Sequence, residues 1–146
     1  MNDIQIDTLG YFVDRTYTNM VKFLNSELSK TNLELQHPQF TLLMVLSKKD
    51  GIPQSLINEV VDRDRASVSR NLKYLEKKEY IQKVKKGGKK KLIFLTQKGK
   101  SILPIINEIA NKDTECTLKD FTEREKKTIY HLLTRMYKNI SSSIDQ

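Results

Sequence analysis

The spacing of apolar residues predicts a long helix at each end of the chain. In residues 7–29 and again in residues 122–140, apolar side chains return every three or four positions, which places them on one face of a helix. The second run begins with Thr122-Glu123-Arg124-Glu125, a capping box whose side chains bond free N–H groups of the first turn. The N-terminal stripe consists of Leu9, Val13, Tyr17, Met20, Leu24 and Leu28, and the C-terminal stripe of Ile129, Leu132, Leu133, Met136, Tyr137 and Ile140. We expect the C-terminal helix to bury its stripe.

A short helix is predicted next along the chain, followed by a turn. Pro38 suits the first turn of a helix, because proline lacks the N–H group that this turn leaves unpaired. The apolar positions of this helix are Phe40, Leu43, Met44 and Leu46. The run Lys48-Lys49-Asp50-Gly51 then ends it, and Ile52 forms a strand of one or two residues.

Two further helices follow with few residues between them. Pro53 opens the first, and the second spans Asp64–Lys78. Asp62 or Asp64 is its N-cap, where a carboxylate accepts the free backbone N–H groups. The inward positions are Leu56, Ile57, Val60 and Val61 in the first of these helices, and Val68, Leu72 and Leu75 in the second.

From Tyr80 the pattern changes to that of strands. Residues 80–86 and 90–95 are predicted to pair around Lys86-Gly87-Gly88-Lys89. Two glycines tolerate the positive φ angles of a tight hairpin turn.

A helix capped by Thr96 follows the hairpin, and Pro104 should kink this helix or end its first turns. Its apolar face consists of Ile102, Ile106 and Ile109. The predicted order is therefore four helices, a hairpin and two helices, a mainly α fold with a small β-hairpin. Two short helices, a tight turn and a hairpin in this order form a winged helix-turn-helix with additional N- and C-terminal helices.

The first and last helices have wider apolar faces than a chain of 146 residues should leave in water. We therefore expect a homodimer. The alternative is that the two helices pack only on each other within one chain. The residues expected at the dimer contact are Leu9, Val13, Ile129, Leu132, Leu133, Met136 and Ile140.

The charge is concentrated in one segment. The whole chain carries a net charge of +8. Residues 62–100 hold 14 Lys and Arg against four acidic residues, a surplus of ten, so the rest of the chain sums to −2. A concentrated basic segment favours a polyanionic partner, whereas an even spread would indicate only a solubilising surface.

The helix Asp64–Lys78 is the candidate reader of DNA bases. Because Val68 is held in the core, its neighbours project elsewhere from the half of the helix that helix-turn-helix proteins insert into the major groove. The alternative is an ordinary polar solvent face. The candidate base-reading residues are Arg65, Ser67, Ser69, Arg70, Asn71 and Lys73.

The predicted hairpin is the candidate wing. Its lysines can neutralise phosphates without reading sequence, although a solvated charge run is the commoner fate of lysines. The apolar run Leu92-Ile93-Phe94-Leu95 anchors the hairpin to a core. Lys83 also lies in this hairpin, and the candidate phosphate-binding residues are Lys85, Lys86, Lys89, Lys90 and Lys91.

The ordered spacing of several segments resembles a known family. These segments are Asp64-Arg65-Ala66-Ser67-Val68-Ser69-Arg70, then Leu72, Leu75-Glu76-Lys77-Lys78 and Ile81, then Leu95-Thr96-Gln97-Lys98-Gly99, together with Gln39-Phe40, Leu43 and Leu46. They closely resemble the MarR family of bacterial winged helix-turn-helix transcriptional regulators.

The resemblance implies how the chain is organised and controlled. It implies a single domain over residues 1–146, with residues 1–30 and 97–146 as a dimerisation lobe and residues 31–96 as a DNA-binding lobe. Two winged units of an obligate homodimer would bind a pseudo-palindromic site. A small aromatic or anionic ligand would bind between the lobes. At helical spacing such residues more often form plain core; the candidate pocket residues are Tyr11, Tyr17, His37, Phe40 and Met44.

Three positions depart from the family pattern. Gly87-Gly88-Lys89-Lys90-Lys91 replaces the usual Asp-x-Arg of the wing, and lysine lacks the planar fork of arginine, so minor-groove reading should weaken. Glu79 replaces the usual glycine after the recognition helix, where left-handed geometry would strain it. Pro104 interrupts the following helix.

Other function classes find little support in the sequence. There is no phosphate-binding glycine motif, and His37 and His131 lie far apart with no motif around them. Cys116 is the only cysteine, which excludes an intrachain disulfide, and we expect neither a metal, a cofactor nor an enzymatic activity. No apolar run is long enough to span a membrane, and the N-terminal residues include acids and no basic segment, so we expect no signal peptide and a cytoplasmic location.

We therefore expect a sequence-specific regulator that binds double-stranded DNA and acts as a repressor. The alternative is a winged-helix adaptor or architectural protein that binds nucleic acid or a protein without operator specificity.

Overall fold

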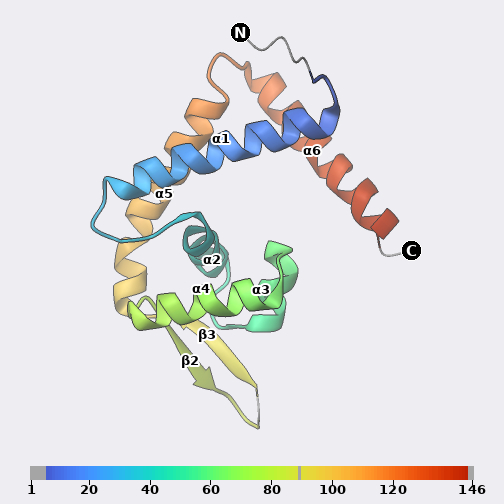
Figure 1. Ribbon diagram of the computed structural model, residues 1–146. Coiled ribbons are helices and arrows are strands. Elements are labelled where there is room, and N and C mark those ends of the chain that lie inside the picture. Colours follow the sequence, from blue (N-terminus) through green and yellow to red (C-terminus); the bar gives the residue numbers. More distant parts are fainter. Residues whose placement is uncertain (1–5, 89, 145–146) are drawn as a thin grey trace. The chain divides into compact units, whose positions relative to one another are not determined.

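The computed structural model describes residues 6–88 and 90–144, which form six helices and three strands (Figure 1). The elements are α1 (Leu9–Ser29), α2 (His37–Lys48), β1 (Ile52–Pro53), α3 (Gln54–Val61), α4 (Arg65–Lys77), β2 (Ile81–Lys85), β3 (Lys91–Leu95), α5 (Gln97–Thr117) and α6 (Glu123–Ile144). The mainly α fold with a small sheet is as predicted, and every helix lies where the sequence places it.

The chain forms two compact units, which we describe separately. The first ends at Asp113 and contains α1 to α4, the sheet and most of α5; the second begins at Thr114 and contains the end of α5 and α6. This boundary falls inside α5. The two lobes expected from the family resemblance, with a boundary near residue 97, stay a prediction.

One hydrophobic core holds the first unit together. The C-terminal half of α1 contributes Leu24 and Leu28, and α5 contributes its predicted face. Helices α2, α3 and α4 and all three strands add most of the remaining buried side chains, of which the most enclosed are Leu43, Leu46, Ile57, Leu72, Leu75, Ile81 and Ile93. The core thus lies behind α4 and fixes the orientation of that helix.

Side-chain caps set the start of most helices. The Asp64 carboxylate accepts the N–H of Ser67 at 2.8 Å, and the Thr96 hydroxyl accepts the N–H of Gly99 at 2.9 Å, both as predicted. Asp62, the other candidate cap of α4, instead ends α3 with a left-handed φ of 47°. The capping box at Thr122 is formed, and α5 continues through Pro104 rather than ending there.

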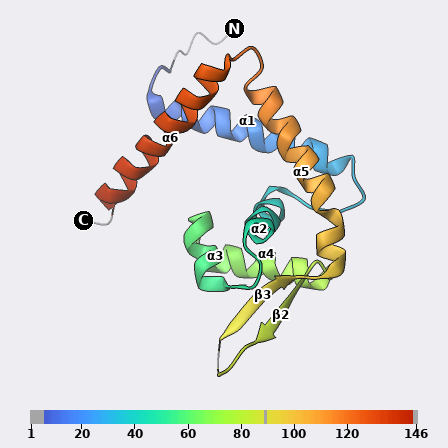
Figure 2. The same cartoon turned by 180° about the vertical axis from the view of Figure 1, so that it is seen from behind.

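The three strands form an antiparallel sheet in the order β1-β3-β2. Ile52 pairs with Ile93, and Lys85 pairs with Lys91 next to the turn of the hairpin. Figures 1 and 2 show the hairpin of β2 and β3 projecting from the layer that α2, α3 and α4 form. Gly87 and Gly88 at its tip have φ of 54° and 70°, which confirms the predicted turn chemistry.

Two expectations about burial are wrong for the single chain. Val60 is 58% exposed. Helix α3 has only eight residues, and the face that contacts the core is the one with Ile57 and Val61, so Val60 remains in solvent. No residue of α6 is buried: Leu133 is 47% and Ile140 61% exposed. The second unit is too short to build a core around this stripe, and its one buried hydrophobic residue among those described is Leu118.

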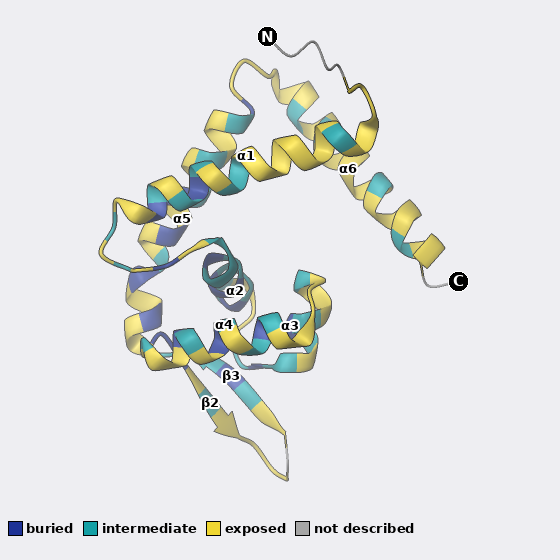
Figure 3. Cartoon of the chain, viewed as in Figure 1, coloured by how far each residue is buried: buried dark blue, intermediate teal, exposed yellow. Residues whose placement is uncertain are grey.

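The N-terminal half of α1 is also exposed (Figure 3). Within the predicted stripe, Leu24 and Leu28 are buried, but Leu9, Val13 and Tyr17 are not. The stripe is therefore continuous in sequence and divided in structure, with an inner half in the core and an outer half in solvent.

Candidate nucleic-acid interface

Helix α4 has a buried face and a basic face. Val68, Leu72 and Leu75 are at most 2% exposed, as the sequence predicted. Away from this stripe, Arg65, Arg70 and Lys73 are exposed, and within the described ranges none of their side chains makes a hydrogen bond or an ion pair. Four-residue steps carry Arg65, Ser69 and Lys73 along one side of the helix. Three cations without partners on a fixed helix are available to an external anion.

Asn71 occupies a different environment from these cations. Its carboxamide oxygen accepts a hydrogen bond from Gln39 Nε2 at 2.7 Å, and its Nδ2 donates to the carbonyl of Ser67 at 2.8 Å. Gln39 in turn accepts the N–H of Gln36 at the start of α2. Asn71 therefore ties α4 to α2, and its side chain is already engaged at both ends.

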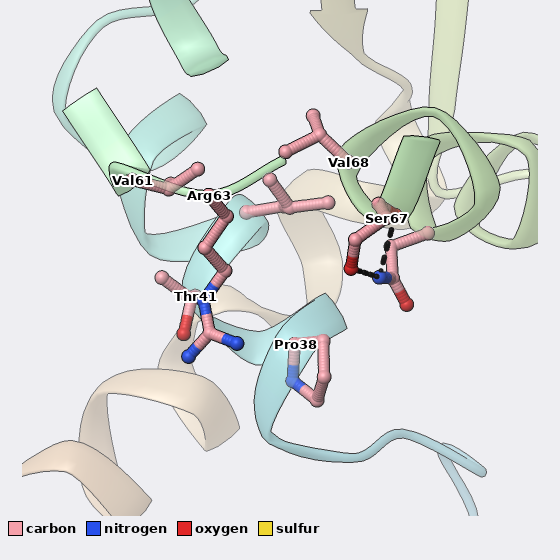
Figure 4. A pocket seen from close by; sticks show the side chains of 8 residues that line it. Pro38, Thr41, Val61, Arg63, Ser67 and Val68 are labelled. Atoms are coloured by element: carbon pink, nitrogen blue, oxygen red, sulfur yellow. Dashed lines mark hydrogen bonds between the residues drawn. The ribbon is translucent and has the colours of Figure 1, made fainter. Parts of the chain in front are cut away.

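A shallow depression beside Asn71 lies between α2 and α4 (Figure 4). Figure 4 shows Arg63 extending from the turn before α4 past Thr41, with Pro38 and Ser67 both on the side away from Thr41. Its guanidinium donates to the Tyr17 hydroxyl of α1 at 2.7 Å. This role of Arg63 has no signal in the sequence, because its partner lies 46 residues away.

The hairpin presents its lysines in close proximity. Lys85, Lys86, Lys90 and Lys91 are exposed, and Lys85 faces Lys91 directly across the two strands. Like charges in this position destabilise a hairpin unless an anion neutralises them. Lys86 lies over the Phe94 ring, 5.8 Å from its centre. Lys89, also predicted for the wing, lies outside the described residues.

Lys83 differs from the lysines of the tip. It is half-buried, and its ammonium lies 3.5 Å from the carboxylate of Glu76 in α4. This ion pair joins the wing to the recognition helix and leaves Lys83 to position the hairpin.

Asp50 and Gly99 fix the base of the hairpin. The Asp50 carboxylate accepts the N–H of Leu95 at 2.8 Å and lies 3.8 Å from the ammonium of Lys100. At Gly99 the chain approaches the Tyr80 carbonyl so closely that a Cβ would lie 2.0 Å from its oxygen. The wing therefore projects from a base with little freedom to move.

The turn after α4 has the predicted left-handed residue. Glu79 has a φ of 62°, its N–H donates to the carbonyl of Glu76, and the N–H of Tyr80 donates to that of Leu75. These two bonds form a Schellman motif, which glycine usually completes.

Two of the five predicted pocket residues line a cavity in the described part of the chain. Tyr17 and His37 line a cavity of about 70 Å³ together with Asp113 of α5. Phe40 and Met44 belong to the core, and the Tyr11 hydroxyl accepts a hydrogen bond from Arg15. Burial, and then the charge of Arg63, lower the pKa of His37, while burial raises the pKa of Asp113. Asp113 continues the helical row of Ile106 and Ile109. An acidic residue on an apolar row is the feature of the sequence that could have identified Asp113 as a candidate.

Other kinds of site are not formed by the described residues. They include no group of three or more His, Cys, Asp or Glu able to hold a metal ion. None of the helices in the described ranges is both long enough and apolar enough to cross a membrane.

The fold and the basic surface define a winged helix-turn-helix protein. The profile of the MarR family matches residues 35–91. The transcriptional regulator YybA of Bacillus subtilis (strain 168), of the helix-turn-helix type, is 35% identical over 117 residues, which cover 79% of this chain and 78% of YybA. The chain belongs to the MarR family of transcriptional regulators, which are not enzymes.

Two solved structures extend the comparison. A protein described as a MarR-family transcriptional regulator of Listeria monocytogenes, complexed with a 26mer DNA, is 27% identical, with a TM-score of 0.86 and coverage of 94% of this chain and 92% of that one. BpsR of Bordetella bronchiseptica, whose DNA binding is regulated by 6-hydroxynicotinic acid, shares the fold at 20% identity, with a TM-score of 0.81 and coverage of 90% and 99%.

Proposed function

We propose that this regulator binds double-stranded DNA with α4 in the major groove and the hairpin on the flanking phosphates. The observation that carries the proposal is the row of unpaired cations on α4, directly followed in the chain by a lysine hairpin. Arginine can bond two acceptors of a guanine edge at once, so Arg65 and Arg70 are suited to base reading. The Listeria relative, which is complexed with DNA, supports the binding of DNA by this chain.

The two elements contribute different parts of the binding. The base-reading set reduces to Arg65, Ser69, Arg70 and Lys73, because Asn71 is engaged with Gln39 and Ser67 lines the depression beside it. The wing contributes affinity for any sequence, because lysines meet phosphates as point charges.

We propose further that the protein acts as a homodimer controlled by a small effector. The exposed apolar rows of α1 and α6 support the dimer, because water-exposed apolar rows of this length mark contact surfaces. Two copies of α4 would then read a pseudo-palindromic operator. The family resemblance suggests an aromatic or anionic effector. The expected location is the cytoplasm and the expected output is repression, because a bound dimer occludes its DNA.

Selection of bound fragments from genomic DNA tests operator binding. We expect one palindromic sequence to be enriched and to bind at least about 10³-fold more tightly than random duplex at the same salt concentration. Equal affinity for every duplex would contradict an operator and would favour the architectural role that the lysine-only wing also suits.

Two sets of variants separate the roles of the elements. Arg70→Ala should relax the base preference, whereas Arg135→Ala, which changes an exposed arginine of α6, should leave it unchanged.

Replacing Lys89, Lys90 and Lys91 by Ala should weaken binding to all sequences. It should also reduce the slope of the logarithm of the binding constant against the logarithm of the salt concentration by up to about three. The control replaces the exposed Lys119, Lys127 and Lys138, which removes the same charge. An unchanged salt slope in the wing variant would show that the tip does not touch DNA.

A further inference from the structure

The cavity of the first unit has an apolar wall and a polar end. Met20, Val21 and Leu24 of α1 form the wall, and Tyr17, His37 and Asp113 supply the polar groups. Its volume of about 70 Å³ exceeds the roughly 30 Å³ that one water molecule occupies in the liquid. The cavity therefore has room for part of a small organic molecule that carries one polar group.

One buried acceptor at the polar end lacks a hydrogen-bond donor. The Oδ1 atom of Asp113 is buried, and none of the described residues donates a hydrogen bond to it. A buried acceptor without a donor is costly and rare in folded proteins. The Tyr17 hydroxyl already accepts a hydrogen bond from Arg63. A ligand that supplies N–H donors would complete the hydrogen bonding of Asp113.

The charges around the cavity favour a cation over an anion. Asp113 is the only acidic residue among those that line it, and no Lys or Arg is among them. Arg63 is exposed to solvent and bound to Tyr17, and Lys112, next to Asp113, pairs with Glu108 at 3.0 Å. Burial lowers the pKa of His37, which favours its neutral form at neutral pH. A carboxylate ligand would therefore meet the Asp113 carboxylate with no cation lining the cavity between them.

We propose that this cavity binds the ammonium group of a small organic cation against Asp113, with the apolar stem of the cation along Met20, Val21 and Leu24. The inference rests on the proposed function only in assigning the cation as an effector. It replaces the anionic effector that the family resemblance implies with a cationic one. The ring of Tyr17 adds a second favourable contact, because aromatic faces attract cations.

The position of the cavity gives the ligand a route to the recognition helix. Tyr17 lines the cavity and accepts the hydrogen bond of Arg63, and Arg63 directly precedes Asp64, the N-cap of α4. A ligand that shifts Tyr17 would therefore also shift Arg63, which adjoins the start of the recognition helix.

Methyl NMR of the full chain without DNA tests the proposal. The Met20 methyl lines the cavity, and the methyl of Met136 in α6 serves as an internal reference. Three probes of the same length are titrated at neutral pH: butylammonium, butyrate and 1-butanol. We expect a saturable shift of Met20 with butylammonium and binding at least about tenfold weaker for butyrate.

Two variants identify the carboxylate responsible. Asp113→Asn should lose the preference for butylammonium over 1-butanol. Asp7→Asn removes an equal charge from an exposed residue ahead of α1 and should retain the preference. Butyrate binding as tightly as butylammonium, no saturable Met20 shift with any probe, or a preference that survives Asp113→Asn would each overturn the proposal. Because these readouts need no DNA, their failure is distinguishable from a failure of operator binding.

Discussion

Single residues at the junction of α4, the hairpin and α5 determine where the wing lies. Thr96 caps α5 with its hydroxyl and also donates that hydroxyl to the carbonyl of Glu79 at 2.5 Å. The Thr96 N–H donates to the Tyr80 carbonyl, against which Gly99 packs. Three segments of the chain thus meet at one point, and a side chain at residue 99 has no space there.

Gly99→Ala should therefore destabilise the protein, by about 1–3 kcal/mol in the free energy of unfolding, because the added methyl overlaps backbone that cannot move aside. Gly10→Ala is the matched control. Nothing lies within 4 Å of a Cβ at Gly10, and alanine is favoured over glycine inside a helix by about 1 kcal/mol, so this variant should be stabilised. Urea unfolding measures both, and destabilisation of equal size would refute the close approach at Gly99.

His37 should make the stability depend on pH. Burial first, and the Arg63 charge second, hold its pKa below the ordinary value, so the folded chain binds a proton less readily than the unfolded chain. The stability contributed by the neutral imidazole is present above about pH 6.5 and is lost as the pH falls through that value toward the folded-state pKa. Asp113, whose pKa is raised, acts in the opposite direction.

The measurement is the free energy of unfolding at about pH 7.5 and about pH 5. His37→Gln should lose less stability on acidification than the parent protein. Both proteins retain Asp113, so its opposite contribution is the same in each. His131→Gln, which changes an exposed histidine of α6, should match the parent. A pH dependence that is the same in all three proteins would exclude His37 as its source.

Secondary-structure elements were predictable to the extent that their signals are local. The caps Asp64 and Thr96, the glycines of the hairpin tip and the stripe of α4 act over a few residues, and all are confirmed. The hydrogen bonds from Gln39 to Asn71 and from Arg63 to Tyr17 join residues that are 32 and 46 positions apart, so helical spacing could not indicate them. Burial in α6 was mispredicted because an apolar stripe does not specify which chain covers it.

Asp50 illustrates how one element is held by another. Its carboxylate joins the turn after α2 to the end of β3 through the N–H of Leu95. Asp50→Ala should cost about 1–3 kcal/mol in the free energy of unfolding, because that N–H loses its acceptor. It should also speed hydrogen exchange at Leu95. Asp50→Asn keeps an oxygen in place and should cost less, and equal losses in both variants would show that the hydrogen bond is unimportant.

The whole molecule combines a well-packed unit with exposed apolar rows. The first unit encloses its core, whereas the outer half of α1 and the face of α6 leave large apolar side chains in water. A single chain therefore leaves these apolar side chains exposed to water. Association of two chains would bury them, as the proposed function requires.

Leu133→Glu combined with Ile140→Glu should convert the proposed dimer into a monomer, because buried unpaired carboxylates are strongly unfavourable. The two residues lie seven apart on one face of α6. Thr134→Glu combined with Ser142→Glu adds the same charge elsewhere on the exposed surface of this helix and should remain dimeric. Sedimentation equilibrium gives the mass, and circular dichroism confirms that the helices persist. A dimer that survives the first pair of changes would place the contact elsewhere.

The lysine tip of the hairpin bears on how a regulator searches a chromosome. Contacts to phosphates are available at every position of a duplex, so a protein that relies on them slides and hops along DNA between targets. A genome offers about 10⁶–10⁹ competing positions, and these would hold most copies away from the operator. Occupancy of the target then depends on the ratio of protein copies to total DNA as well as on the strength of the specific complex. Because the tip holds paired lysines in place of a sequence-reading arginine, the threshold for regulation should respond to copy number and to ionic strength together.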